Sequence, residues 1–267
     1  LAGSAESVNA LTREMLAAYR ERYYNPKNMI IAAAGRIGAE DLLALSKRYL
    51  AHLPGIAAPD FKAAEPHRPE GPAMQVHFKE TEQTHLALGL HAINRFHPDR
   101  YVMSLLNIIM GANMSSRLFH IVRDEMALCY EISSTVRLYY DAGVFVISAG
   151  VDERKLVKCL EVVLNELARM KREPVPKEEL RRAKEYYRGQ LLFALEDTMS
   201  CMLWLGEKVT VGEKNFDIKK ILKRMEAVTP DDLMRVSAGI FTEGNLSMAL
   251  IGPIKDEKKA KEALRLK

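Results

Sequence analysis

The chain is poor in cysteine and has no long apolar run. Its three cysteines are Cys129, Cys159 and Cys201, and none belongs to a Cys-x-x-Cys pair. An odd and widely spaced set of cysteines argues against a disulfide framework and favours buried thiols in a reducing compartment. No apolar run approaches the roughly 18 residues of a membrane-spanning helix, and no signal peptide is visible. We therefore expect no membrane partner.

Motifs that hold metals or phosphates are also missing. No two of the seven histidines lie four residues apart around a glutamate, the pattern that signals zinc on a helix. The nearest grouping is His77, Glu80 and His85, but His77 and Glu80 would point to opposite faces of a strand. Neither a phosphate-binding glycine loop nor a Gly-x-Ser-x-Gly elbow occurs. We expect no metal ligand within this chain.

The composition is that of an ordinary globular protein. The 267 residues are 48% hydrophobic and 28% charged, which is enough apolar material for at least one sizeable core. The net charge is +4, with basic and acidic residues interleaved. The stretches richest in lysine and arginine, 154–188 and 255–267, follow helical patterns that also contain acidic residues. No nucleic-acid partner is expected from this charge pattern.

The sequence ends the way it begins. Residues 11–50 align with residues 228–267 without a gap, and apolar residues fall on apolar residues through most of that alignment. Asn28, for example, aligns with Asn245. Both stretches predict a helix, a short turn, a buried strand ending at glycine, and a second helix. Solenoid repeats have periods of about 20–50 residues, so this longer offset indicates two copies of a whole domain, the first of them truncated.

The pattern of apolar residues predicts an α+β fold. In the first copy, helices at 6–24 and 39–52 flank the apolar run Met29–Ala34, which we predict to be a buried strand. The second copy is expected to contain groups of strands alternating with groups of helices. The strands are 74–78, 85–93, 131–140 and 143–151, and the helices are 99–111, 115–127, 153–172, 176–196, 198–212 and 217–225. Strands and helices grouped in this way predict an antiparallel sheet with helices packed on one face.

A proline-rich stretch provides the best domain boundary. It has few apolar residues, and its prolines are Pro54, Pro59, Pro66, Pro69 and Pro72. Such a composition predicts an extended linker over residues 54–73. Residues 1–53 would then be the closing segment of the first domain, and residues 74–267 the complete second domain.

Residues 110–134, MGANMSSRLFHIVRDEMALCYEISS, contain the candidate binding residues. Arg123 and Tyr130 lie about two helical turns apart, with Tyr130 beyond the expected helix end. A guanidinium and a phenol can together grip peptide carbonyls or a carboxylate. In the alternative interpretation, Arg123 pairs with a nearby acid and Tyr130 packs under the sheet.

Two other groups are weaker candidates. Gln83, Thr84 and His85 begin a strand that could line a cavity, although packing within the sheet also explains them. The apolar cluster between Met199 and Leu205 is typical of a helix in a core or at a domain interface, although methionine-rich surfaces also adapt to varied partners.

The segment MSSRLFHIVRDEMALCY resembles a signature in the C-terminal half of the M16 metallopeptidases, the relatives of pitrilysin, insulinase and the mitochondrial processing peptidase. The likeness extends along the chain. SVNALTREMLAAYRERYYNPKNMIIAAAGRI is similar to the end of the family's first domain, and EPVPKEELRRAKEYYRGQLLFALEDTMSCMLWLGE to part of its second. Ala127 and Cys129 stand where the family usually has glycine and alanine, which affects the turn before Tyr130.

The resemblance implies a clam-like zinc protease built from two homologous domains, most similar to short bacterial members. The family's zinc motif, His-x-x-Glu-His with a distal glutamate, belongs to the first domain and matches nothing in this chain. No catalytic residue is therefore expected here, and zinc would be bound by the missing N-terminal half. Arg123 and Tyr130 match positions that contact substrate in relatives.

The function that this resemblance implies is the C-terminal, substrate-binding part of a zinc-dependent endopeptidase that cleaves enclosed peptides and is inactive without its other half. The expected partners are a peptide substrate, the N-terminal half of the same protein, and a second copy or an M16 partner subunit. A bacterial cytoplasmic location is expected. The alternatives are a catalytically inactive partner subunit or scaffold of the same fold, and a free-standing peptide-binding module.

Overall fold

The chain folds into two compact units in a computed structural model. The N-terminal unit comprises Leu1–Ala63 together with Leu192–Phe216, and the sheet unit comprises Ala64–Leu191 together with Asp217–Lys267. Much of the predicted linker, 54–73, lies outside the described residues. The structure describes residues 3–53, 55–56, 61–64, 71–213 and 216–266.

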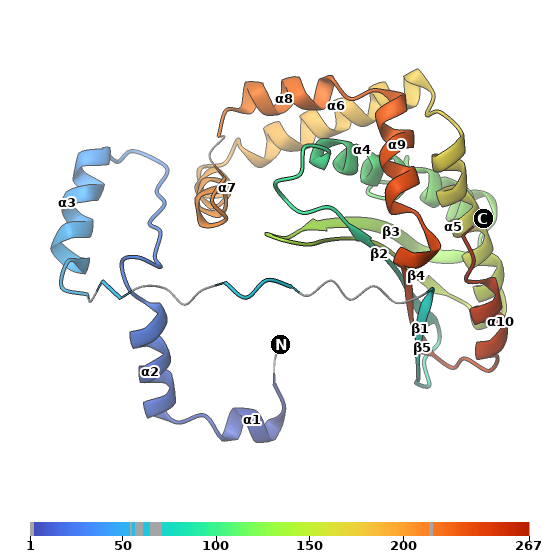
Figure 1. Ribbon diagram of the computed structural model, residues 1–267, viewed down its shortest axis with the longest axis horizontal. Helices are drawn as coiled ribbons and strands as arrows, with labels where there is room; N and C mark the ends of the chain where they lie inside the picture. Colours follow the sequence, from blue (N-terminus) through green and yellow to red (C-terminus); the bar gives the residue numbers. More distant parts are fainter. Residues whose placement is uncertain (1–2, 54, 57–60, 65–70, 214–215, 267) are drawn as a thin grey trace. The chain divides into compact units, whose positions relative to one another are not determined.

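A five-stranded sheet organises the described part of the sheet unit, with strand order β1-β5-β2-β4-β3 (Figure 1). The strands are β1 Ala73–Phe78, β2 Thr84–Ala92, β3 Cys129–Leu138, β4 Gly143–Val151 and β5 Leu246–Gly252. Neighbouring strands are antiparallel except β1 and β5, which are parallel. The predicted antiparallel sheet is thus confirmed, with one parallel pair at its edge. A parallel pair requires a long connection, which the intervening strands and helices supply.

Helices cover one face of this sheet (Figure 1). They are α4 Arg100–Met110, α5 Leu156–Arg172, α6 Lys177–Ala194, α8 Ile218–Glu226, α9 Pro230–Ile240 and α10 Glu257–Ala263. Along β2, Leu86, Leu88 and Leu90 are buried, whereas His85, directly before them, is exposed and Ala87 between them is only partly buried. This alternation gives the sheet a core face and an open face, because successive side chains of a strand point in opposite directions.

The N-terminal unit contains helices without a described strand. Its helices are α1 Ala5–Asn9, α2 Arg13–Tyr23, α3 Ala39–Leu50 and α7 Thr198–Thr210. The buried strand predicted at Met29–Ala34 is wrong for this structure, since the segment is unpaired and Ile30 and Ile31 are 45% and 46% exposed. A strand forms only when its backbone groups find partners, and the described residues of this unit offer none.

The repeat is visible in the local backbone. Helices α2 and α9 occupy equivalent positions in the two aligned stretches. Each begins after a threonine, Thr12 or Thr229, whose hydroxyl accepts a hydrogen bond from the backbone N–H three residues later. The segments that follow end at Gly35 and Gly252, with φ of +131° and +159°. Both glycines adopt a region that side chains disfavour, which explains their recurrence.

Candidate functional site

A π-helix, η1 (Phe119–Glu125), carries Arg123. Its wider turn is seen in the hydrogen bond that the Met126 backbone N–H donates to the Ile121 carbonyl, at 3.1 Å. The ordinary helix predicted over 115–127 is therefore corrected here. In an α-helix each backbone N–H donates to the carbonyl four residues earlier. Here the Met126 N–H donates to the carbonyl five residues earlier, so each turn closed in this way holds one more residue. π-Helices are rare and occur frequently at functional sites.

Ala127 turns the chain from η1 into β3. Its φ is +47°, and it is the only non-glycine residue with a positive φ in the described part of the chain. The left-handed conformation costs a residue with a side chain about 1–2 kcal/mol, a cost that glycine avoids because it has no Cβ. The Lys155 ammonium donates a hydrogen bond to the Ala127 carbonyl at 2.8 Å, which holds the turn. Alanine therefore replaces the family's usual glycine at a position whose backbone conformation favours glycine.

A β-bulge at the start of β3 presents Tyr130. Cys129 pairs with Val151 and Glu131 pairs with Gly150, so Tyr130 is the extra residue between two consecutive partners. Cys129 is buried, whereas Tyr130 is 81% exposed. Bulges re-aim side chains and are enriched next to active sites. The alternative in which Tyr130 packs under the sheet is therefore wrong.

Arg123 is exposed beside an aromatic ring. Its guanidinium carbon lies 4.5 Å from the centre of the Phe119 ring, a cation–π contact. Among the described residues Arg123 forms no ion pair, so the alternative in which it pairs with a nearby acid is not what the structure shows. The guanidinium retains donors for a carbonyl or carboxylate group.

The other arginine of the segment has a structural role. Arg117 donates through Nε and Nη2 to the two carboxylate oxygens of Glu179, at 2.8 and 2.7 Å. Its Nη1 lies 3.9 Å from a buried oxygen of Glu166, and the Arg117 side chain is only 13% exposed. The hydrogen bonds to Glu179 raise the pKa of Arg117. Arg117 thus links the segment just before η1 to α6 through Glu179 and to α5 through Glu166.

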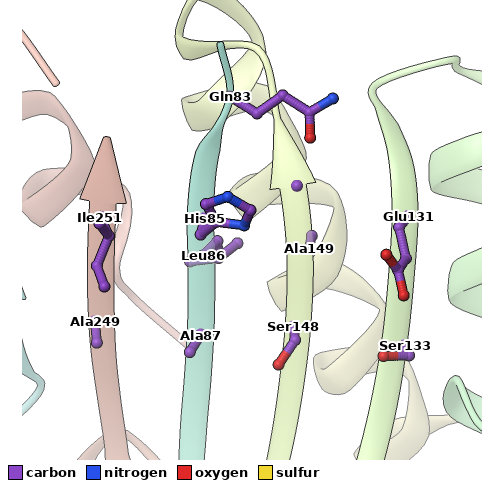
Figure 2. Close-up of a pocket in the computed structure, with 11 residues that line it drawn as sticks. Gln83, His85, Leu86, Ala87, Glu131, Ser133, Ser148, Ala149, Ala249 and Ile251 are labelled. Atoms are coloured by element: carbon purple, nitrogen blue, oxygen red, sulfur yellow. The ribbon is translucent and has the colours of Figure 1, made fainter. Parts of the chain in front are cut away.

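A cavity of about 350 Å³ lies on the open face of the sheet (Figure 2). Its described lining is Gln83, His85, Leu86, Ala87, Glu131, Ser133, Ser148, Ala149, Gly150, Ala249 and Ile251. Glu131 directly follows Tyr130, so the bulge adjoins the cavity. A Cβ atom at Gly150 would lie 2.5 Å from Gln83 Oε1, so glycine leaves room for that side chain. Of the candidates Gln83–His85, the first and last line this cavity, while Thr84 is buried on the opposite face.

The residues present do not fit a zinc site. Within the described ranges, no group of three or more histidine, cysteine, aspartate or glutamate side chains is arranged to hold a metal ion. Nor does any helix in those ranges have the length and apolarity needed to cross a membrane. No metal-dependent step is therefore assigned to side chains of this chain.

Comparison with known proteins identifies relatives of the whole chain. The family described as "Peptidase M16 inactive domain" matches residues 10–187. An uncharacterized zinc protease of Streptomyces coelicolor is 28% identical over 264 residues, which are 96% of this chain and 57% of that protein. The chain therefore spans less than two thirds of that relative's length.

Solved structures show the same fold. A peptidase M16 inactive domain from Pseudomonas fluorescens superposes with a TM-score of 0.85 and 22% identity, covering 95% of this chain and 60% of that one. A chain of complex III2 from Candida albicans gives a TM-score of 0.80 and 18% identity, covering 98% and 64%. The α+β architecture, the family match and the curated relative agree, and the chain belongs to the peptidase M16 family.

Proposed function

We propose that this chain is the substrate-binding part of a zinc-dependent M16 peptidase, and that Arg123 and Tyr130 hold a peptide against the open face of the sheet. The observation that carries this proposal is the run of irregular backbone from η1 to the bulge. A π-helix, a left-handed alanine and a β-bulge follow one another between Phe119 and Glu131. Strained or irregular backbone concentrates at functional sites.

The two side chains suit a peptide. The Arg123 guanidinium donates in a planar fork, which matches a carboxylate or two neighbouring carbonyl groups. The Tyr130 phenol both donates and accepts. Stacking on Phe119 limits the rotamers of Arg123, so less entropy is lost when it binds. Both residues are thus prepared to orient a substrate, and orientation is a major source of catalytic rate.

In this proposal, cleavage takes place on a zinc ion held outside this chain. The curated relative is named a zinc protease and is longer than this chain. Zinc, when bound, lowers the pKa of a water molecule and polarises the scissile carbonyl. The residues of this chain bind and orient the peptide, and alone they should hydrolyse nothing.

Exposed apolar residues of the N-terminal unit support a partner domain. In the sheet unit, β5 lies between β1 and β2. By the alignment of 11–50 with 228–267, Met29–Ala34 would take the same central place between two strands of the first copy. Large apolar residues on α2 and α3 are now exposed, including Leu16, Tyr19 and Leu43. Exposure of large apolar residues on both helices favours a partner, which we propose is the N-terminal half of the same protein.

The test uses the full-length protein that contains this chain. Hydrolysis of a quenched fluorescent peptide is measured with and without a chelator, then after zinc is restored. We expect cleavage that the chelator abolishes and zinc restores, and a loss of about tenfold or more in kcat/KM for both Arg123→Met and Tyr130→Phe. Tyr139→Phe, at another exposed tyrosine beyond the end of β3, is the matched control and should leave kcat/KM unchanged.

An inactive subunit or scaffold of the same fold is the second candidate. The likeness to a chain of complex III2 favours it, since that similarity extends over 98% of this chain. Under this alternative, the full-length protein would show no chelator-sensitive cleavage alone, and hydrolysis would appear only after an M16 partner subunit is added. A homodimer and a cytoplasmic location stay predictions, which sedimentation and cell fractionation would test.

A further inference from the structure

The strand register places His85 and Glu131 on either side of a glycine. His85 pairs with Gly150 across β2 and β4, and Glu131 pairs with the same Gly150 across β4 and β3. Adjacent strands lie about 4.8 Å apart, so the backbones of His85 and Glu131 are about 10 Å apart. Gly150 contributes no side chain between them, and the Gln83 amide lies over that glycine. Figure 2 shows the imidazole and the carboxylate on the same face of the sheet.

The next row across the sheet is formed by small side chains. Ala249 pairs with Ala87, Ala87 with Ser148, and Ser148 with Ser133. These residues make a low floor beside Gly150. Together the two rows enclose the cavity of about 350 Å³. Ligand pockets in proteins measure about 300–1,000 Å³, so this space is large enough to accept a side chain of a bound peptide.

The charge of this cavity comes from Glu131. Within the described residues, its carboxylate has no hydrogen bond or ion pair, and no other carboxylate lines the cavity. Gln83, His85 and Ser133 add further hydrogen-bonding groups. A peptide lying over the sheet would remove water from the Glu131 carboxylate, which is unfavourable unless a cationic group replaces that water. A lysine or arginine side chain would supply both the charge and the hydrogen bonds.

We propose that this cavity is a specificity pocket that accepts one cationic side chain of the bound peptide, with Glu131 as its counter-charge. His85 forms the opposite wall, the Gln83 amide lies over Gly150, and the small residues form the floor. The bulge at Tyr130 also sets the position of Glu131. The same backbone irregularity therefore positions both the pocket's carboxylate and Tyr130. The inference rests on the proposed function only in taking a peptide as the ligand.

The experiment compares lysine with norleucine, which has a similar length but no charge. A lysine is moved one position at a time along a neutral peptide, and norleucine replaces it in a matched series. For the full-length protein we expect lysine to raise kcat/KM about tenfold over norleucine at one position, the size of effect expected for a charge-assisted hydrogen bond. Glu131→Gln should remove that preference while leaving the norleucine peptides unchanged.

Two variants separate charge from shape. Glu161→Gln removes an exposed carboxylate on α5, in the helical layer on the other face, and should keep the preference. Ala87→Leu fills the floor without changing the charge, and should lower kcat/KM for both long side chains at the same position. The pocket inference is overturned if Glu131→Gln changes the lysine and norleucine peptides by the same factor.

Binding measured without turnover distinguishes this inference from the proposed function. The same peptides, fluorescently labelled, are titrated with full-length protein and followed by anisotropy. Lysine-dependent binding that Glu131→Gln abolishes, in a protein that cleaves nothing, would support the pocket and refute the peptidase. Cleavage without any dependence on Glu131 would support the peptidase and refute the pocket.

Discussion

Asn28 and Asn245 form the same hydrogen bond in the two copies of the repeat. Asn28 Nδ2 donates to the Tyr23 carbonyl at 2.8 Å, and Asn245 Nδ2 donates to the Ile240 carbonyl at 3.1 Å. In both cases the acceptor is the last residue of a helix, whose carbonyl has no partner within the helix. The bond holds the following turn against the end of the helix. Donor and acceptor are five residues apart, so the turn forms from residues within each copy.

Removing this bond should destabilise the second copy. Asn245→Ala leaves the Ile240 carbonyl without its side-chain donor, and we expect the free energy of unfolding to fall by about 1 kcal/mol, the usual net contribution of one hydrogen bond. Urea denaturation followed by circular dichroism measures the change. Asn28→Ala should cost less, since Asn28 is exposed and the segment after it is unpaired. An equal or larger effect at Asn28 would contradict this account.

Replacing Ala127 by glycine should stabilise the fold. Because its φ is +47°, Ala127→Gly relieves left-handed strain, and we expect unfolding to require about 1 kcal/mol more free energy. Ala168→Gly, in the middle of α5, is the matched control and should lose about 1 kcal/mol or more. Thermal and urea denaturation check both signs. Destabilisation by both substitutions would show that Ala127 is unstrained.

The two arginines of the 110–134 segment should separate stability from binding. Arg117→Met breaks a largely buried fork with Glu179, and we expect a loss of about 3 kcal/mol in the free energy of unfolding. Arg123→Met removes an exposed side chain and should change stability by less than about 0.5 kcal/mol. Urea denaturation of both variants is compared with peptide hydrolysis by the full-length protein. A stability loss at Arg123 as large as that at Arg117 would mean that Arg123 is structural too.

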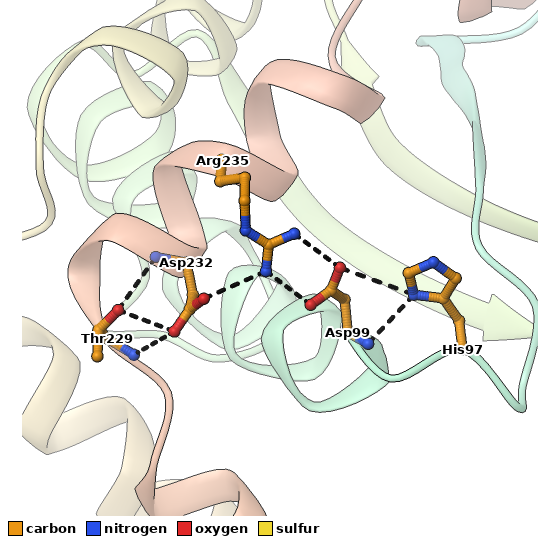
Figure 3. Close-up of polar contacts among 5 residues, drawn as sticks. All are labelled: His97, Asp99, Thr229, Asp232 and Arg235. Atoms are coloured by element: carbon orange, nitrogen blue, oxygen red, sulfur yellow. Dashed lines mark hydrogen bonds and ion pairs between the residues drawn. The ribbon is translucent and has the colours of Figure 1, made fainter.

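A polar network ties the start of α4 to α9 (Figure 3). Arg235 donates to both carboxylate oxygens of Asp99, at 2.9 and 2.7 Å, and to Asp232 at 3.2 Å. The Thr229 hydroxyl donates to Asp232 at 2.8 Å, and His97 Nδ1 accepts the Asp99 backbone N–H at 3.1 Å. The bond from Arg235 lowers the pKa of Asp99, and the bond from Thr229 lowers the pKa of Asp232.

These lowered pKa values predict a loss of stability in acid. A carboxylate with a depressed folded-state pKa stabilises the fold fully above its unfolded pKa, about 3.9 for aspartate, and loses that contribution as the pH falls toward the folded value. We expect Asp99→Asn to flatten the decline in the urea midpoint between about pH 5 and pH 3. In an Arg235→Met background, Asp99→Asn should change the slope little. An unchanged slope in the single variant would exclude Asp99 as a contributor.

Much of the fold followed from local patterns. Apolar runs and the turn at 141–143 predicted β2 and β4 to within a residue or so. The predicted strand at Met29–Ala34 was wrong for this structure, although its sequence resembles that of β5. A strand's stability comes from its neighbours, and the described residues provide neighbours for β5 but none for Met29–Ala34.

The candidate site was only partly predictable. The residue types at Arg123 and Tyr130 left two interpretations open, and the family resemblance favoured binding. Helical spacing could not reveal the π-helix or the bulge that presents them. Glu131 was missed, since nothing in its local sequence shows that Gly150 lies beside it. A glycine paired between two polar residues is visible only once the strand register is known.

The sequence by itself determined the repeat, the helix caps, the largely antiparallel sheet and the identity of the candidate binding residues, because these depend on neighbours within a few positions or on residue type. Only the tertiary structure decided which arginine is exposed, which way Tyr130 points, and that His85 and Glu131 lie on the same face of the sheet on either side of Gly150. Those outcomes depend on strand register and on a single extra residue in β3, and a shift of one residue in a strand moves every side chain to the opposite face.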